Sequence, residues 1–172
     1  MKTLLLLRHA KSSWSDPTLP DHDRPLAPRG RKAAPRMGAL MRERGHQPDL
    51  ILCSPAARTR ETLSLLGSVG QEVPVIFDPV IYDGEAEELL ERIRRLEPPG
   101  DTLLVIGHNP TLEDLAGLLV NTDAPGDTEA LARLRDKFPT AALAVLEADA
   151  ATWAGVDGGG LRLASFTRPR DL

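Results

Sequence analysis

The 172-residue sequence has a single cysteine, Cys53, and few aromatic residues, which make up 3% of the chain. A single cysteine excludes an internal disulfide. Cys53 ends the apolar run Leu50–Cys53. We therefore expect it to be a small buried hydrophobic residue and not a reactive thiol.

The sequence also lacks a strong excess of charge and any long hydrophobic run. The formal net charge of -4 at pH 7 argues against a nucleic-acid partner. The run Leu4–Leu7 is too short to span a bilayer or to form the core of a signal peptide. We therefore expect a cytoplasmic protein with no nucleic-acid partner and no membrane association.

The composition is that of an ordinary globular domain, with 41% hydrophobic and 27% charged residues. A chain of this length buries a substantial core without disulfides or metals. No internal repeat, linker or low-complexity segment interrupts it. We expect one domain over residues 1–172.

The run Leu4–Leu7 is followed directly by Arg8 and His9. A strand that is apolar on both faces is typical of the centre of a parallel sheet. Its carboxyl end then carries the two polar residues, at the edge where open α/β sheets bind ligands. This placement predicts anion binding with proton or phosphoryl chemistry. The alternative is a strand that simply ends in polar residues.

Apolar runs and helical periodicities alternate along the rest of the chain, after an irregular, proline-containing loop at 11–28. We expect further strands at 49–53, 73–77, 102–106, 141–146 and 161–166, and helices at 29–45, 55–66, 86–96, 110–119 and 129–133. Such alternation predicts an α/β fold, a three-layer α/β/α sandwich with a mostly parallel sheet. The turn-rich segment 154–160 predicts that the last two strands form an antiparallel hairpin.

Polar side chains follow three of the expected strands. Arg8 and His9 follow the first strand, Ser54 and Arg58 the second, and His108 the fourth. The carboxyl ends of parallel strands lie at one edge of a sheet, so these residues are expected to converge. Ser54 is expected to be the N-cap of the next helix, which places Arg58 in the first turn, facing an anion site.

Four motifs in order resemble those of the histidine phosphatase superfamily, which includes the cofactor-dependent phosphoglycerate mutases. They are Arg8-His9-Ala10, Asp23-Arg24-Pro25-Leu26 with Gly30, the segment Ser54–Thr62, and Gly107-His108-Asn109-Pro110. Ala10 replaces the usual glycine, and an alanine there resembles the small bacterial branch of phosphohistidine phosphatases called SixA. The resemblance spans most of the chain and implies a phosphoglycerate mutase-like fold.

The resemblance implies that His9 is the nucleophile that accepts the phosphoryl group and that Arg8, Arg58 and His108 bind that group. Physical chemistry agrees, because phosphoryl transfer depends mainly on positioning and on charge stabilisation, which guanidinium groups supply. No metal or cofactor is expected. Neither histidine lies in a spacing typical of metal ligands.

The acid that protonates the leaving group has no clear match. Larger relatives use a glutamate near the end of the third strand, where this sequence has Asp83 and Glu85. We take Asp83 as the first candidate for this catalytic residue and Glu85 as the second. The alternative is that either one caps the helix expected to begin near Ala86. An imidazole leaving group would need no strong acid.

The sequence therefore predicts a metal-independent phosphatase with a phosphohistidine intermediate, most similar to the SixA-type phosphohistidine phosphatases and acting on a phosphorylated protein. A small-molecule phosphomonoesterase on the same fold is the first alternative, and a non-catalytic phosphate- or phosphoprotein-binding module is the second. A mutase is disfavoured because the short chain leaves no room for a cap domain. Trp14 either offers a contact at the rim of the site or packs under its own loop.

Overall fold

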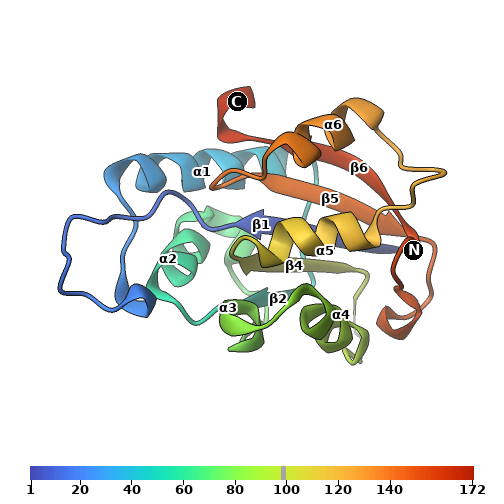
Figure 1. Cartoon of the computed structure of the whole chain (residues 1–172), viewed down its shortest axis with the longest axis horizontal. Helices are drawn as coiled ribbons and strands as arrows, with labels where there is room; N and C mark the ends of the chain where they lie inside the picture. The colour runs from blue at the N-terminus through green and yellow to red at the C-terminus, as the bar shows by residue number, and fades with distance from the viewer. Residues whose placement is uncertain (98–99) are drawn as a thin grey trace.

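The computed structural model describes residues 1–97 and 100–172. Within these ranges, six strands form one sheet in the order β3-β2-β4-β1-β5-β6 (Figure 1). Their bounds are Lys2–Arg8 (β1), Leu50–Cys53 (β2), Val75–Phe77 (β3), Thr102–Gly107 (β4), Leu143–Ala148 (β5) and Leu161–Thr167 (β6). The first four strands are parallel, and β5 and β6 are antiparallel to their neighbours. The predicted mixed sheet with its C-terminal hairpin is confirmed.

Helices connect the strands. The α-helices are Pro28–Glu43 (α1), Ala57–Leu65 (α2), Val80–Asp83 (α3), Ala86–Arg94 (α4), Thr111–Leu119 (α5) and Thr128–Asp136 (α6). Short 3-10 turns lie at Asp21–Asp23 (η1), Gly67–Gly70 (η2), Trp153–Gly155 (η3) and Pro169–Asp171 (η4). No helix of the described residues is long and apolar enough to cross a membrane.

Two helices begin later than predicted. The N-cap of α2 is Ala56 and not Ser54, so the prediction for Ser54 is wrong. The Ser54 hydroxyl is instead within hydrogen-bonding distance of a histidine ring across the sheet edge. Pro110 is the N-cap of α5 and not its first helical residue. Both helices are therefore preceded by a short irregular segment at the edge of the sheet.

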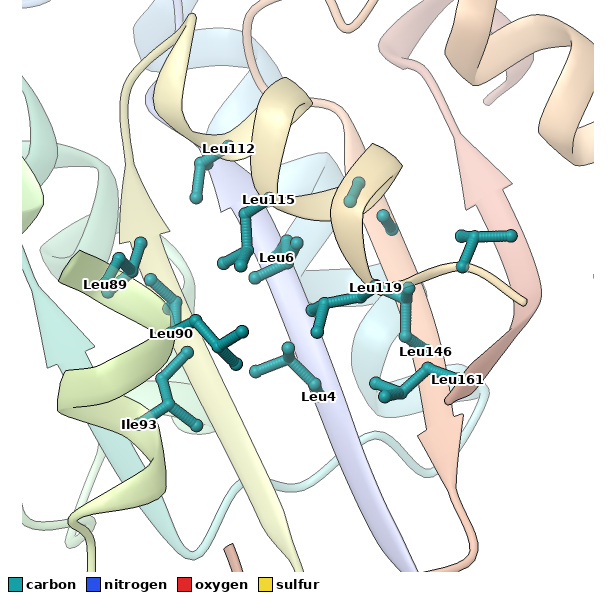
Figure 2. Close-up of a cluster of buried hydrophobic side chains, with 14 of the residues drawn as sticks. Leu4, Leu6, Leu89, Leu90, Ile93, Leu112, Leu115, Leu119, Leu146 and Leu161 are labelled. Atoms are coloured by element: carbon teal, nitrogen blue, oxygen red, sulfur yellow. The ribbon is translucent and has the colours of Figure 1, made fainter. Parts of the chain in front are cut away.

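The two faces of β1 pack against different helices, because successive side chains of a strand point to opposite sides. Leu4 and Leu6 belong to a cluster with residues of α4 and α5 (Figure 2). Leu5 and Leu7 belong to a second cluster with residues of α1. All four leucines are fully buried, and each contributes about 1.5–3 kcal/mol to folding. This arrangement confirms the predicted three layers.

Cys53 is fully buried at the end of β2. Burial raises the pKa of its thiol to about 12, so the thiol stays protonated at neutral pH. The prediction of a buried hydrophobic residue is confirmed.

The loop after β1 packs on the first turn of α1. The Ala27 N–H donates a hydrogen bond to the Lys11 carbonyl at 2.8 Å. A methyl group added at Gly30 would overlap the same carbonyl oxygen. Glycine at this position therefore allows the close approach of loop and helix that carries the chain away from the end of β1.

Gly30→Ala should lower the free energy of unfolding by about 1–3 kcal/mol, because the added methyl group forces the loop away from α1. Gly117→Ala is the matched control, since nothing lies within 4 Å of the added methyl group on α5. This control should raise the free energy of unfolding by up to about 1 kcal/mol, as alanine is the better helix former. Urea unfolding followed by circular dichroism compares the two. Equal stability of the two variants would contradict this packing.

Candidate active site

His9 follows the last residue of β1 and is buried. Its backbone N–H donates to the Gly107 carbonyl at 3.0 Å, and the N–H of Ala10 donates to the Thr62 hydroxyl at 3.0 Å. The ring Nδ1 lies 2.7 Å from the Ala10 carbonyl oxygen. A carbonyl only accepts hydrogen bonds, so Nδ1 carries the hydrogen in the neutral ring. The lone pair is therefore on Nε2.

The His9 ring is uncharged at neutral pH. Burial lowers its pKa to about 4, and the nearby positive charges of Arg58 and Arg8 act in the same direction. A neutral imidazole with its lone pair on Nε2 is the nucleophilic form. The strand end thus holds a histidine in the protonation state and the tautomer that attack at phosphorus requires.

His108 follows β4, the parallel neighbour of β1, and its ring centroid lies 5.2 Å from that of His9. Burial lowers its pKa to about 3, with further contributions from His9 and Arg58. Its Nε2 lies 2.7 Å from the Ser54 hydroxyl, which also accepts a hydrogen bond from the Ala56 N–H at 3.3 Å. We therefore assign the hydroxyl as donor to Nε2, which leaves a hydrogen on Nδ1.

Two guanidinium groups lie in the same region. Arg58, in the first turn of α2, donates from Nη1 to the Asp21 carbonyl at 2.8 Å and from Nη2 to the Asp21 carboxylate at 3.0 Å. Arg8, the last residue of β1, donates from Nη1 to the Phe138 carbonyl at 3.0 Å. Burial lowers the pKa of Arg8, as does the positive charge of Arg58. The structure thus brings together Arg8, Arg58 and His108, as predicted.

Three buried nitrogen atoms of this group have no hydrogen-bond partner among the described residues. They are Nε of Arg8, Nε of Arg58 and Nδ1 of His108. Buried polar atoms are nearly always paired in folded proteins. Unpaired donors on three side chains around a neutral histidine therefore indicate a site for an oxyanion.

Asp21 and Tyr82 belong to the site, although the sequence analysis did not select them. The Asp21 carboxylate accepts hydrogen bonds from the Tyr82 hydroxyl at 2.7 Å, from Arg58 at 3.0 Å and from Arg24 at 3.2 Å. The hydrogen bond from Tyr82 is the main reason why the pKa of the Asp21 carboxyl group is lowered to about 2. The Tyr82 ring meets His108 edge-on at 5.4 Å. A usable signal was that Tyr82 is the single tyrosine and directly precedes Asp83.

Asp83 and Glu85 lie apart from this network. Asp83 is the last residue of α3, and its side chain is exposed. Glu85 is the N-cap of α4, and its backbone N–H donates to the Glu88 carboxylate at 3.2 Å. Within the described residues, neither carboxylate hydrogen-bonds to the histidines or to the two arginines. The cap is therefore formed by Glu85 and not by Asp83.

The loop at 11–28 borders the site through Arg24, whose side chain is buried. Arg24 donates to the Ser12 hydroxyl at 3.1 Å and stacks on Trp14, with 3.5 Å from its guanidinium carbon to the ring centroid. Trp14 is 72% exposed, so it does not pack under its own loop. Arg24 thus links the loop both to Asp21 and to an exposed aromatic ring.

The described residues contain no group of three or more histidine, cysteine, aspartate or glutamate side chains placed to hold a metal ion. The positive charge next to His9 comes from the guanidinium groups of Arg58, Arg8 and Arg24.

Comparison with known proteins supports the predicted family. The model of the histidine phosphatase superfamily (branch 1) matches residues 4–83. An uncharacterized protein of Mycobacterium tuberculosis is 38% identical over 164 residues, which cover 95% of this chain and 100% of that protein.

Solved structures agree. The protein from Nakamurella multipartitia assigned as phosphohistidine phosphatase SixA has a TM-score of 0.82 at 34% identity, covering 98% of this chain and 96% of that chain. The corresponding protein from Agrobacterium tumefaciens has a TM-score of 0.80 at 32% identity, covering 98% of each chain. These similarities confirm the phosphoglycerate mutase-like α/β fold. The chain belongs to the histidine phosphatase superfamily.

Proposed function

We propose that this protein is a phosphatase that forms a phosphohistidine on His9, and that its substrate is a phosphohistidine of another protein. The observation that carries the proposal is the set of unpaired nitrogen atoms on Arg8, Arg58 and His108, three side chains that lie near the neutral His9 ring. Two guanidinium groups and a histidine N–H supply the charge stabilisation, so the mechanism needs no metal ion.

The reaction has two steps. In the first, Nε2 of His9 attacks phosphorus, the N–P bond forms, and the bond to the leaving group breaks with its electron pair. Arg8, Arg58 and the Nδ1 hydrogen of His108 stabilise the charge on the equatorial oxygens. In the second step water attacks phosphorus, the N–P bond breaks, and His9 returns to its neutral form as inorganic phosphate leaves.

The absence of a protonated carboxylic acid among the hydrogen-bonded side chains favours an easily displaced leaving group. The Asp21 pKa of about 2 keeps this carboxylate ionised, so it has no proton to donate at neutral pH. A protonated imidazole leaves phosphorus readily, whereas an alkoxide must be protonated as it leaves. The related structures assigned as phosphohistidine phosphatases are consistent with such a substrate.

A small phosphomonoester is the second candidate substrate, and Tyr82 is the observation that favours it. Its phenol lies beside His108 and stays protonated, because the hydrogen bond to Asp21 raises its pKa. A phenol in this position is able to protonate an alkoxide. Asp83 and Glu85 remain the carboxylic acids proposed for the same role.

His9→Ala should abolish turnover, because the phosphoryl group then has no acceptor. The wild-type protein should carry acid-labile, base-stable phosphate after rapid quenching during turnover. His46→Ala is the matched control, since His46 lies beyond the end of α1, and this variant should retain activity. Phosphate release and protein-bound phosphate are measured with p-nitrophenyl phosphate. Turnover by His9→Ala would refute the mechanism, and a wild-type protein that binds phosphate without turnover would indicate a binding module.

Ser54→Ala should lower kcat by roughly 10- to 100-fold, by analogy with the loss of a hydrogen-bond partner of a metal-ligating histidine. The reason is that His108 Nε2 loses the donor that keeps the hydrogen on Nδ1. Ser64→Ala removes an exposed hydroxyl on α2 and serves as control. Steady-state kinetics of the two variants test this role, which an unchanged kcat in Ser54→Ala would exclude.

Removal of the true acid should slow alkyl phosphates far more than p-nitrophenyl phosphate, whose phenolate leaves unaided. The variants to compare are Asp83→Asn, Glu85→Gln and Tyr82→Phe. Arg8→Ala should instead slow every substrate by about 10²- to 10³-fold, because it contacts the phosphoryl group itself. The ratio of kcat/KM values for the two substrates identifies the acid. If none of the three variants changes this ratio, the phosphohistidine substrate is favoured over the phosphomonoester.

A further inference from the structure

A basic pocket lies beside the candidate site. Lys11, Arg29, Arg168 and Arg170 line it together with neutral residues, and no acidic residue does. The cavity has a volume of about 110 Å³. Four cations around one cavity are unexpected in a protein whose formal net charge is -4. Such a pocket attracts anions.

The pocket is at the same edge of the sheet as His9. Strand β6 is antiparallel to β5, and β5 is antiparallel to β1, so β6 runs in the direction of β1. Arg168 and Arg170 follow the carboxyl end of β6, as His9 follows that of β1. Lys11 comes two residues after His9, so their Cα atoms are at most about 7.6 Å apart.

One chain segment forms part of both the pocket and the candidate site. The Phe138 carbonyl accepts the Arg8 hydrogen bond at 3.0 Å, and the Ala141 N–H donates to the His9 carbonyl at 3.0 Å. Pro139 and Thr140, between these two contacts, line the pocket. The segment 138–141 therefore connects the pocket with the strand end that carries His9.

Most of the positive charge in the pocket is available to a ligand. Arg168 is paired with Asp171 at 2.8 Å. Lys11, Arg29 and Arg170 form no ion pair with any residue that the structure describes. Arg29 also lies in the first turn of α1, where the helix dipole adds to the positive potential.

We propose that this pocket binds an acidic segment next to the phosphohistidine of a protein substrate. The inference rests on the proposed function. Lys11, Arg29 and Arg170 are unpaired and come from three separate chain segments. They are therefore able to bind several carboxylates spaced along one peptide. An extended peptide advances about 3.3–3.6 Å per residue, so glutamates two to four residues from the phosphohistidine reach the pocket while the phosphoryl group is at His9.

Two synthetic phosphohistidine peptides test the proposal, one with glutamates at these flanking positions and one with glutamines. Wild-type protein should show a higher kcat/KM for the glutamate peptide. Arg29→Gln and Arg170→Gln should each reduce this preference about two- to fivefold, the effect of one exposed ion pair, and should leave the glutamine peptide unaffected. Arg95→Gln is the matched control, because it removes an exposed charge at the end of α4, which lies near Asp49 and Leu50 at the amino-terminal end of β2.

Equal kcat/KM values of wild-type protein for the two peptides would overturn the proposal and leave the proposed function intact. A preference that persists in both Arg29→Gln and Arg170→Gln, or that falls equally in Arg95→Gln, would overturn it as well. Failure of wild-type protein to hydrolyse either peptide, while p-nitrophenyl phosphate is hydrolysed, would refute the phosphohistidine substrate and this inference with it.

Discussion

The parallel pairing of β1 with β4 is the constraint on which the candidate site depends. Arg8 lies opposite Gly107 in the register, so the next residue of each strand, His9 and His108, emerges at the same level. A shift of one residue would turn the leucines of β1 to the wrong faces of the sheet, because side chains alternate. The hydrophobic core therefore also determines the separation of the two histidines.

The second constraint is electrostatic. Burial makes a protonated histidine unfavourable at both His9 and His108, and the positive charges of Arg8 and Arg58 add to this effect. The same charges that would attract an oxyanion thus help to keep His9 neutral. Within residues 1–97 and 100–172, Asp21 is the one carboxylate hydrogen-bonded to Arg8 or Arg58, and it is held ionised. Charge and protonation state in this site follow from one arrangement of side chains.

The strands and helices were predictable from the sequence, because apolar runs and helical periodicity indicate them. The residues that follow the strands were predictable for the same reason. Arg58 and His108 follow strands recognisable by their apolar runs, so topology alone placed them correctly. Asp21 and Tyr82 were missed and Ser54 was given the wrong role, because the roles of all three depend on contacts between segments far apart in the chain. In the sequence, Asp21 is 37 residues from Arg58 and 61 residues from Tyr82, yet it is hydrogen-bonded to both. No local periodicity encodes such pairs.

The contact between Asp21 and Arg58 bears on how tightly the site holds a phosphate ion. The Asp21 carboxylate neutralises part of the Arg58 guanidinium charge. A phosphate ion that binds Arg58 competes with Asp21 for the guanidinium group. Its binding free energy is therefore only the difference between the phosphate–Arg58 and the Asp21–Arg58 interactions. Inorganic phosphate is therefore held less tightly than a bare arginine would hold it. If the proposed phosphatase activity holds, Asp21 limits inhibition by the phosphate product.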